Sequence, residues 1–223
     1  MKELTYTIAA LLTVIVSTGL LYLYFTSRQK EAKGWKAFFT FTADKKTLIL
    51  STAILLLAAG TYLYSFYVTD SAFLKALMNA ETALWLLALG YIDFREKIIP
   101  NPLILAGIVF WVILSLLDVF IAHTSWKQLL FFSLVGAGIC GGVLFIIALI
   151  VKSALGMGDV KMFFVIGLLY GLTNTYSILL FSIVALAIFS IVMLIAQKVT
   201  RKTSIPMAPF VGFGFLISVL IGM

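Results

Sequence analysis

The chain consists largely of apolar blocks long enough to cross a lipid bilayer. Eight such blocks can be delimited, near 4–25, 47–68, 72–92, 102–121, 128–151, 157–173, 176–197 and 206–222. A helical span needs about 20 mostly apolar residues, with a range of about 17–25. Because lipid offers backbone N–H and C=O groups no partners, blocks of this kind form helices, whose hydrogen bonds are internal. We therefore predict an all-α, polytopic membrane bundle of about eight transmembrane helices.

The composition excludes a water-soluble, disordered or fibrous protein. Of 223 residues, 63% are hydrophobic and 11% are charged, against about 45–50% and about 25% in an average soluble domain. The net charge is +7, but the basic residues lie in short loops, where membrane topology accounts for them. We therefore expect no nucleic-acid partner. The single cysteine, Cys140, has no partner for an internal disulfide and is expected to pack inside its apolar block.

The loop charges predict which side of the membrane each loop faces. The loops after the first, third, fifth and seventh blocks, with their flanking residues, hold 13 of the 16 Lys and Arg residues. Because Lys and Arg are concentrated in cytoplasmic loops, this bias places those four loops in the cytoplasm. We expect a multi-pass protein of the cytoplasmic (inner) membrane, with the bilayer as a partner and both chain ends outside.

Prolines, asparagine and glycines predict local features of the spans. Asn101 is expected to cap the fourth span, and prolines mark the start of the eighth. Glycines four residues apart let helices approach closely in lipid. Such pairs occur at Gly138 and Gly142 in the fifth span and at Gly167 and Gly171 in the sixth.

Two acidic residues lie where a charge is costly and share one side of the membrane. Asp93 ends the third span, and Asp159 falls slightly inside the start of the sixth when that span is counted back from Asn174. They are 66 residues apart in sequence, yet both are at the cytoplasmic face. A carboxylate at such a position is a functional candidate. Glu81 is about 18 Å further along the helix of Asp93, so it cannot join them; we expect it to pair with Lys75 or to line an outer water pocket.

A close carboxyl pair can hydrolyse a peptide bond without a metal ion or cofactor. Because two adjacent carboxylates repel, one tends to hold a proton that the other has lost. The pair then supplies a general base for water and a general acid for the leaving amine. The residues alone leave open a second interpretation, in which both are boundary charges balanced by nearby cations at Arg95, Lys97 and Lys161. Gly156 and Gly158 favour the first, since they permit close contact with another segment.

Three segments resemble motifs of the bacterial prepilin peptidases, the type IV leader peptidases. Asp93–Asn101 (DFREKIIPN) resembles their first aspartate motif, and Gly156–Lys161 (GMGDVK) resembles their GxGD motif with its following lysine. Ile205–Phe210 (IPMAPF) resembles their proline segment before the last span. The motifs occur in the family's order and all map to the face predicted as cytoplasmic. The resemblance covers about residues 72–223.

The resemblance implies an aspartic endopeptidase with Asp93 and Asp159 as its catalytic pair. Family substrates are type IV prepilins and the pseudopilins of type II secretion, cut at the cytoplasmic face between a short basic leader and an apolar helix, usually after glycine. The chain then divides into two N-terminal helices with a basic cytoplasmic loop (1–71) and a six-helix peptidase core (72–223). Substrate-binding or loop-shaping roles fall on residues of the three motifs, namely Pro100, Asn101, Gly156, Gly158, Lys161, Pro206 and Pro209.

The sequence also departs from the family. Many members carry paired CxxC motifs between their first two spans and methylate the new N-terminus. Here that region is only 26–46 and lacks cysteine, so we expect no metal site, no cofactor and no S-adenosylmethionine-dependent methylation. The loop is basic and has four aromatic residues, so we expect it either to lie on the anionic inner leaflet or to serve as a plain tether. Those residues are Trp35, Phe38, Phe39 and Phe41.

Two functions of other classes remain open at this point. A proton- or ion-coupled transporter would use the same carboxylates to carry its ion. A non-catalytic subunit of pilus or secretion assembly would use the glycine-rich faces to hold pilin-like helices.

Overall fold

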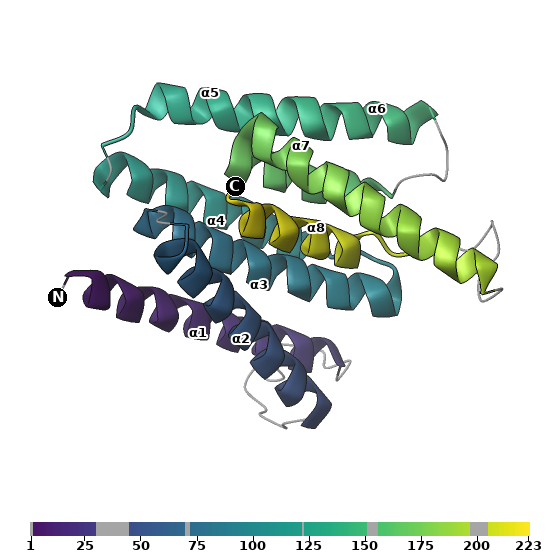
Figure 1. Ribbon diagram of the computed structural model, residues 1–223, viewed down its shortest axis with the longest axis horizontal. Helices are drawn as coiled ribbons and strands as arrows, with labels where there is room; N and C mark the ends of the chain where they lie inside the picture. The colour runs from purple at the N-terminus through teal and green to yellow at the C-terminus, as the bar shows by residue number, and fades with distance from the viewer. Residues whose placement is uncertain (1, 30–44, 70–71, 122, 151–155, 197–204) are drawn as a thin grey trace. The chain divides into compact units, whose positions relative to one another are not determined.

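A computed structural model describes residues 2–29, 45–69, 72–121, 123–150, 156–196 and 205–223, and the regular structure in these ranges is helical. The four aromatic residues of the basic loop, Trp35, Phe38, Phe39 and Phe41, lie outside these ranges. In order, the elements are α1 (Lys2–Gln29), α2 (Lys45–Tyr67), α3 (Phe73–Glu96), α4 (Asn101–Ile121), α5 (Trp126–Gly136), the π-helix η2 (Ala137–Gly141), α6 (Gly142–Ile150), α7 (Met157–Ile195) and α8 (Ala208–Ile221) (Figure 1). The all-α prediction is confirmed.

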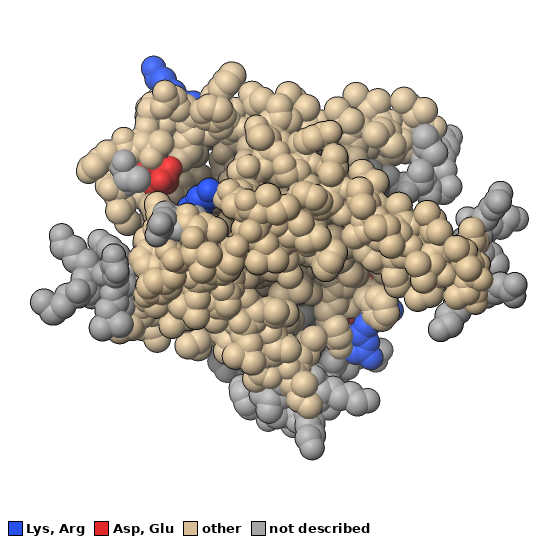
Figure 2. All heavy atoms as spheres, in the orientation of Figure 1, with Lys and Arg blue, Asp and Glu red and all other residues tan. Residues whose placement is uncertain are grey.

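Several of these helices have the length and composition of membrane spans. Within the described ranges, five segments are long and apolar enough to cross a bilayer, at Ile49–Tyr67, Phe73–Glu96, Asn101–Ile121, Trp126–Ile150 and Met157–Ile195. On the face drawn in Figure 2, few of the described residues are Lys, Arg, Asp or Glu, as expected for a chain surrounded by lipid. The chain is therefore a helical membrane protein, and the count of about eight spans stays a prediction.

The chain forms two compact units, Met1–Leu84 and Trp85–Met223, with the boundary inside α3. In the first unit, polar side chains pair within apolar packing. The Ser17 hydroxyl donates to a carboxyl oxygen of Glu81 over 3.1 Å, and Asn79 donates to Ser65 over 3.0 Å. Glu81 is buried, so a hydrogen-bond donor offsets part of its desolvation cost. Its partner is Ser17 on α1, whereas the sequence led us to expect Lys75 or water.

In the second unit, contacts fix the directions of α3, α4 and α8. The indole N–H of Trp85 donates to the carbonyl of Leu103 over 2.7 Å, near the start of α4. At the other end of α3, Gly90 lies against Pro209 in the first turn of α8. A connection of four residues, from Lys97 to Pro100, joins α3 to α4, so these helices are antiparallel neighbours. The end of α3 therefore meets the starts of both α4 and α8.

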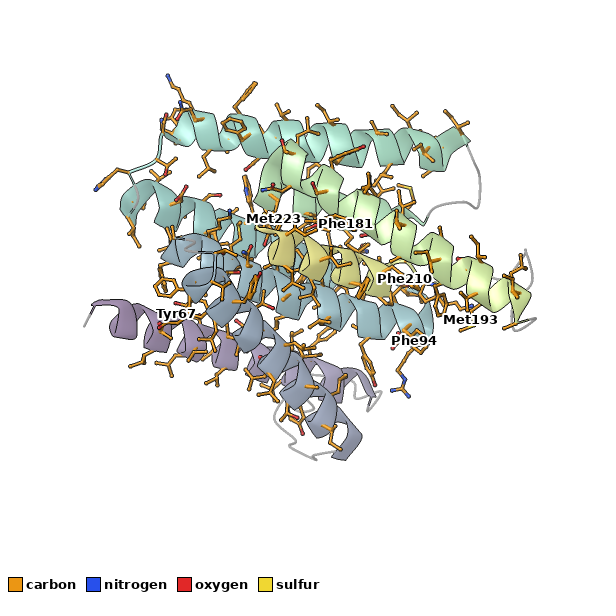
Figure 3. The ribbon with its side chains drawn as sticks, in the orientation of Figure 1. Tyr67, Phe94, Phe181, Met193, Phe210 and Met223 are labelled. Atoms are coloured by element: carbon orange, nitrogen blue, oxygen red, sulfur yellow. The ribbon has the colours of Figure 1, made fainter. Side chains whose placement is uncertain are left out.

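The long helix α7 is two segments that run in opposite directions. Its backbone is non-helical at Gly171 (φ 65°, ψ −169°). Before that residue, Phe164 lies against Gly141 and Gly167 against Ala137, so this segment is antiparallel to α5–α6. After it, the ring of Phe189 contacts that of Phe210 in a tilted arrangement with centroids 5.1 Å apart, and Ser182 lies against Gly214, so the second segment is antiparallel to α8. Both ends of α7 therefore lie on the side of the unit where α8 begins, and Figure 3 shows Met193, near the end of α7, and Phe210, near the start of α8, on that side.

The turn in α7 comes earlier than the sequence blocks indicate. The blocks place it between 173 and 176, but the chain turns at Gly171. The physical reason is the backbone, since this combination of φ and ψ is accessible essentially to glycine alone. Gly171 is thus a turn residue as well as part of a glycine pair.

The glycines that pack against α7 are not the pair expected in the fifth span. A Cβ at Gly136 would lie 2.5 Å from backbone atoms of Gly167 and Gly171, and one at Gly141 would meet Phe164 at 3.1 Å. At Gly138 and Gly142, in contrast, a Cβ would meet nothing within 4 Å. Because η2 is π-helical, residues five apart share a face there. This places Gly136 and Gly141 on the packed face and leaves Gly138 and Gly142 open.

Replacing Gly171 by alanine tests the turn. Alanine at this φ and ψ costs about 1–3 kcal/mol, so the Gly171→Ala variant should unfold at a lower temperature than the wild type in detergent. Gly142→Ala is the matched control, because Gly142 has helical angles (φ −66°, ψ −45°) and open space for a Cβ. Equal unfolding temperatures for Gly171→Ala and the wild type would contradict a turn that requires glycine.

Candidate active site

Asp93 lies in the last turn of α3, where its carboxyl group meets the first turn of α8. The side chain is buried, with 6% of its surface exposed. The backbone N–H of Ala208 donates to its Oδ2 over 3.0 Å, and the backbone of Met207 contributes a second hydrogen bond. The first N–H groups of a helix have no intrahelical acceptor and carry partial positive charge. Asp93 therefore satisfies donors that the start of α8 would otherwise leave buried and unpaired.

The local sequence explains why α8 begins at this point. Met207 is its N-cap and Pro209 stands in its first turn, where a proline loses no helical hydrogen bond. On α3, Gly90 lies three residues before Asp93 and so on the same face. A Cβ at Gly90 would come within 3.1 Å of the Cα of Pro209. The glycine thus lets the first turn of α8 lie close enough for the N–H of Ala208 to reach Asp93, while Pro206 lies just before the helix, outside regular secondary structure.

Asp159 is the third residue of α7 and closes that helix's own cap. Gly156 is the N-cap residue, with extended angles (φ −73°, ψ 143°). The Asp159 carboxyl accepts a hydrogen bond from the backbone of Gly156, the arrangement in which an acid at the third position satisfies the cap N–H. A Cβ at Gly156 would lie 3.1 Å from Oδ2 of Asp159. Glycine therefore leaves room for the carboxyl to fold back over the cap.

Gly158 brings the two acidic residues together. A Cβ at this position would lie 2.8 Å from the Cβ of Ile99, which belongs to the short connection after Asp93. The absence of a side chain thus allows the start of α7 to lie directly against that connection. The two carboxyl groups are thereby brought close enough for the charge of Asp93 to act on Asp159. The structure places both carboxyl groups at one end of the second unit, each held by backbone N–H donors.

The connection from α3 to α4 is stiffened by backbone bonds at both ends. Lys97 adopts a left-handed conformation (φ 54°), and its N–H donates to the carbonyl of Asp93 over 2.8 Å, which ends α3. The carbonyl of Pro100 accepts from Leu103 and Ile104. Pro100, which is buried, therefore stands at the cap position of α4.

Asn101 and Lys161 differ from their expected roles. Asn101 is the first residue of α4, so it is not the cap that the sequence led us to expect; the preceding Pro100 carbonyl serves the first turn. The Asn101 side chain instead accepts a hydrogen bond from Nζ of Lys161 over 3.0 Å. Arg95 donates to the Tyr91 hydroxyl over 2.8 Å. Arg95 and Lys161 are thus engaged with neutral groups, which weakens the view of the two acids as plain boundary charges.

A comparison with models of known protein families identifies the family of this chain. Residues 81–191 match the type IV leader peptidase family. The chain belongs to this family. No curated protein and no solved structure gave a match. The matched range holds Asp93, Asp159 and the glycines around Asp159, and it ends before the proline segment at the start of α8. The chain is therefore a membrane-embedded peptidase of the leader peptidase type.

This leader peptidase uses residues that sequence reasoning missed. Gly90 and Ile99 line the approach of the three motif segments, and the donor from Ala208 is a backbone group that no side-chain pattern reveals. The one available signal was Gly90 itself, which is the one glycine of α3 and lies one helical turn before an acid. Within the described ranges, no group of three or more His, Cys, Asp or Glu residues is arranged to hold a metal ion.

Replacing Gly158 by alanine should lower peptidase activity by about tenfold or more, because a 1.4 kcal/mol loss already corresponds to tenfold. The added Cβ has to displace Ile99 and with it the segment that follows Asp93. A peptidase assay of Gly158→Ala, Ile99→Gly and the double variant measures how the two positions depend on each other. The double variant should be more active than Gly158→Ala, because removing the Ile99 side chain makes room for the added Cβ. Gly212→Ala is the control, since its Cβ meets its nearest neighbours only at 3.9 Å. Full activity of Gly158→Ala would refute the close approach.

Loss of the Lys161–Asn101 hydrogen bond should lower peptidase activity only slightly. It is exposed, and such bonds contribute about 0.5–1 kcal/mol, a factor of about two to five. Asn101→Ala and Lys161→Met should each lower peptidase activity by that factor, and the double variant should be no worse than either. Additive losses in this double-mutant cycle would mean that the two side chains act separately.

Proposed function

We propose that the protein is an aspartic endopeptidase in which Asp93 and Asp159 form the catalytic pair. The observation that supports this most directly is the convergence of two carboxyl groups from separate helices at two helix starts. Each accepts hydrogen bonds from backbone N–H groups, Asp93 from Ala208 and Asp159 from Gly156. Backbone donors of this kind hold a side chain in one orientation at low entropic cost.

The reaction follows from the proximity of the two groups. Two carboxyl groups that are close enough to repel each other when both are ionised are most stable when the pair holds one proton. The ionised carboxylate takes a proton from a water molecule while the water oxygen attacks the scissile carbonyl. The protonated carboxyl group gives its proton to the departing amine. After one turnover the former base carries the proton and the former acid is ionised. A proton transfer from the former base to the former acid restores the starting state. No metal ion or cofactor takes part in this scheme.

The substrates we propose are prepilin-like or pseudopilin precursors, with the cut between a basic leader and an apolar helix. The strong Lys and Arg bias of the loops supports a cytoplasmic site, and by the same rule a basic leader stays on that side. Apolar side chains are exposed beside the two acids, namely Phe94, Ile98 and Met157. Such a rim suits a position where the membrane core meets the headgroups. Phe94 is seen at the end of α3 in Figure 3.

Methylation of the new N-terminus is not part of the function we propose. The basis is the resemblance described above, since the region 26–46 has no counterpart of the paired CxxC motifs. A purified sample that processes a precursor in the presence of S-adenosylmethionine should yield an unmethylated N-terminus by mass spectrometry. A methylated product would overturn this part of the proposal.

The main test is the processing of a pilin-like precursor co-expressed with the full-length protein. Asp93→Asn and Asp159→Asn should each lower leader removal by about a thousandfold or more, because a single carboxyl cannot act as both base and acid. Both proteins should still be found in the membrane fraction at wild-type amounts. Gel mobility and mass of the precursor report the cleavage.

Asp118→Asn is the matched control, because it removes a carboxyl group near the opposite end of α4 and should leave processing unchanged. Normal processing by Asp93→Asn or Asp159→Asn would eliminate the paired-carboxyl mechanism. Binding of the precursor without any processing by the wild type would favour an assembly subunit. Carboxylate-dependent proton flux in proteoliposomes, without processing, would favour a transporter.

A further inference from the structure

An apolar groove adjoins the proposed catalytic pair and is not used by the mechanism above. Its volume is about 600 Å³, and it is formed by α4, by η2 with the start of α6, and by the first segment of α7. Of its described lining residues, only Asn101 and Lys161 are polar, and they lie together at one end, joined by their hydrogen bond. The volume is within the range of about 300–1,000 Å³ that is typical of ligand sites.

The groove begins at the candidate active site. Met157 and Val160 line it, and they are two residues before and one residue after Asp159. From there it follows α7 as far as Phe164 and α4 as far as Ile108. This corresponds to about 10 Å, or two helical turns, along either helix. The groove therefore has a polar end level with the acids and an apolar remainder that extends into the membrane.

Three glycines form part of the floor of the groove, beside Ala137 and Phe145. Gly138, Gly141 and Gly142 all line it. A Cβ added at Gly138 or Gly142 would meet nothing within 4 Å, so the pair expected from the sequence to pack against a helix has no such partner within the described part of the chain. Glycines four residues apart admit a second helix at close range in lipid, where contact between backbones drives association.

We propose that this groove receives the apolar helix of the substrate, directly after the bond that is cut. This inference rests on the proposed function. A precursor of the proposed class has a polar leader and an apolar helix joined at the cleavage site, and the groove has the same polarity in the same order, beginning at Asp159. A helix ridge fits a floor with glycines one turn apart, whereas a flexible acyl chain needs no such spacing. The groove then sets the register of the substrate, since a helix seated there brings one peptide bond to the acids.

The register predicts which substrate positions meet which glycines. Gly141 is level with Phe164 and Ala137 with Gly167. Counting along α7 from Asp159 at about 1.5 Å per residue, Gly142 is level with a substrate residue about four positions past the cut bond, and Gly138 with one about seven to eight positions past it.

Disulfide cross-linking tests the placement. In a Cys140→Ser background, which removes the native thiol, cysteine is introduced at Gly138 or Gly142 and at single positions along the helix of a precursor carrying a basic leader. We expect cross-links near the positions given above. Ile139→Cys and Val143→Cys are matched controls, because these exposed residues neighbour the glycines but do not line the groove. Equal cross-linking from the control positions, or none from the glycine positions, would overturn the groove as the substrate site.

A second experiment fills the groove. Gly138→Leu and Gly142→Leu each place an apolar side chain in open space and should raise the KM for the precursor about tenfold or more without lowering the unfolding temperature. Ile139→Phe and Val143→Phe add volume at exposed positions that do not line the groove and should leave KM unchanged. Unchanged KM in both leucine variants overturns the proposal. Loss of a co-purifying phospholipid from these variants, with unchanged KM, would identify a lipid site instead.

The two proposals fail in different ways. If the aspartate variants abolish processing while the leucine variants process normally, the catalytic pair stands and the groove proposal is wrong. If the glycine cysteines cross-link the precursor although the wild type never cleaves it, the groove stands as a binding site and the peptidase mechanism is wrong.

Discussion

Close backbone contact at glycine is the constraint on which the second unit depends. In lipid, helices gain nothing from hiding apolar surface from each other, so van der Waals contact at short range holds a bundle together. Here that contact occurs at specific glycines. Gly136 and Gly167 let α5 and η2 meet α7, Gly90 admits the first turn of α8, and Gly158 admits the connection after Asp93. The same contacts that hold the helices together therefore position the candidate site.

The polar groups follow from this packing. A buried carboxyl group needs donors, and a helix that starts in a buried place needs acceptors. At Asp93 one hydrogen bond satisfies both groups, because the N–H of Ala208 at the start of α8 donates to the carboxyl oxygen. At Asp159 the acid closes the cap of its own helix through Gly156. The carboxyl group of Asp93 thus lies at the start of α8 and that of Asp159 at the start of its own helix, where backbone N–H groups hold them. This arrangement accounts for how carboxyl groups can be kept close together near apolar surroundings in a leader peptidase.

Gly138 and Gly142, in contrast to the packed glycines, have open space where a side chain would be. These positions are open, and the π-helical turn is what separates them from the packed glycines Gly136 and Gly141. One added residue in the turn lets a single helix present glycine on two faces, one toward α7 and one toward the groove. The same device therefore serves both the internal packing and the surface that we assign to the substrate.

The sequence by itself determined the helical membrane class, the approximate helix positions and the two acids at one membrane face. These follow from block length, from the cost of charge in lipid and from the direction in which successive spans run, all of which are local or additive properties. Only the tertiary structure decided the turn at Gly171, the donors that hold Asp93 and Asp159, the cap at Pro100 in place of Asn101, and which glycines are packed. Each of these depends on a particular backbone angle or on a backbone atom of a distant segment. Backbone angles and distant backbone atoms do not produce a recognisable pattern of residues in the sequence. The groove beside Asp159 is of the same kind, since it exists only where three helices leave space between them.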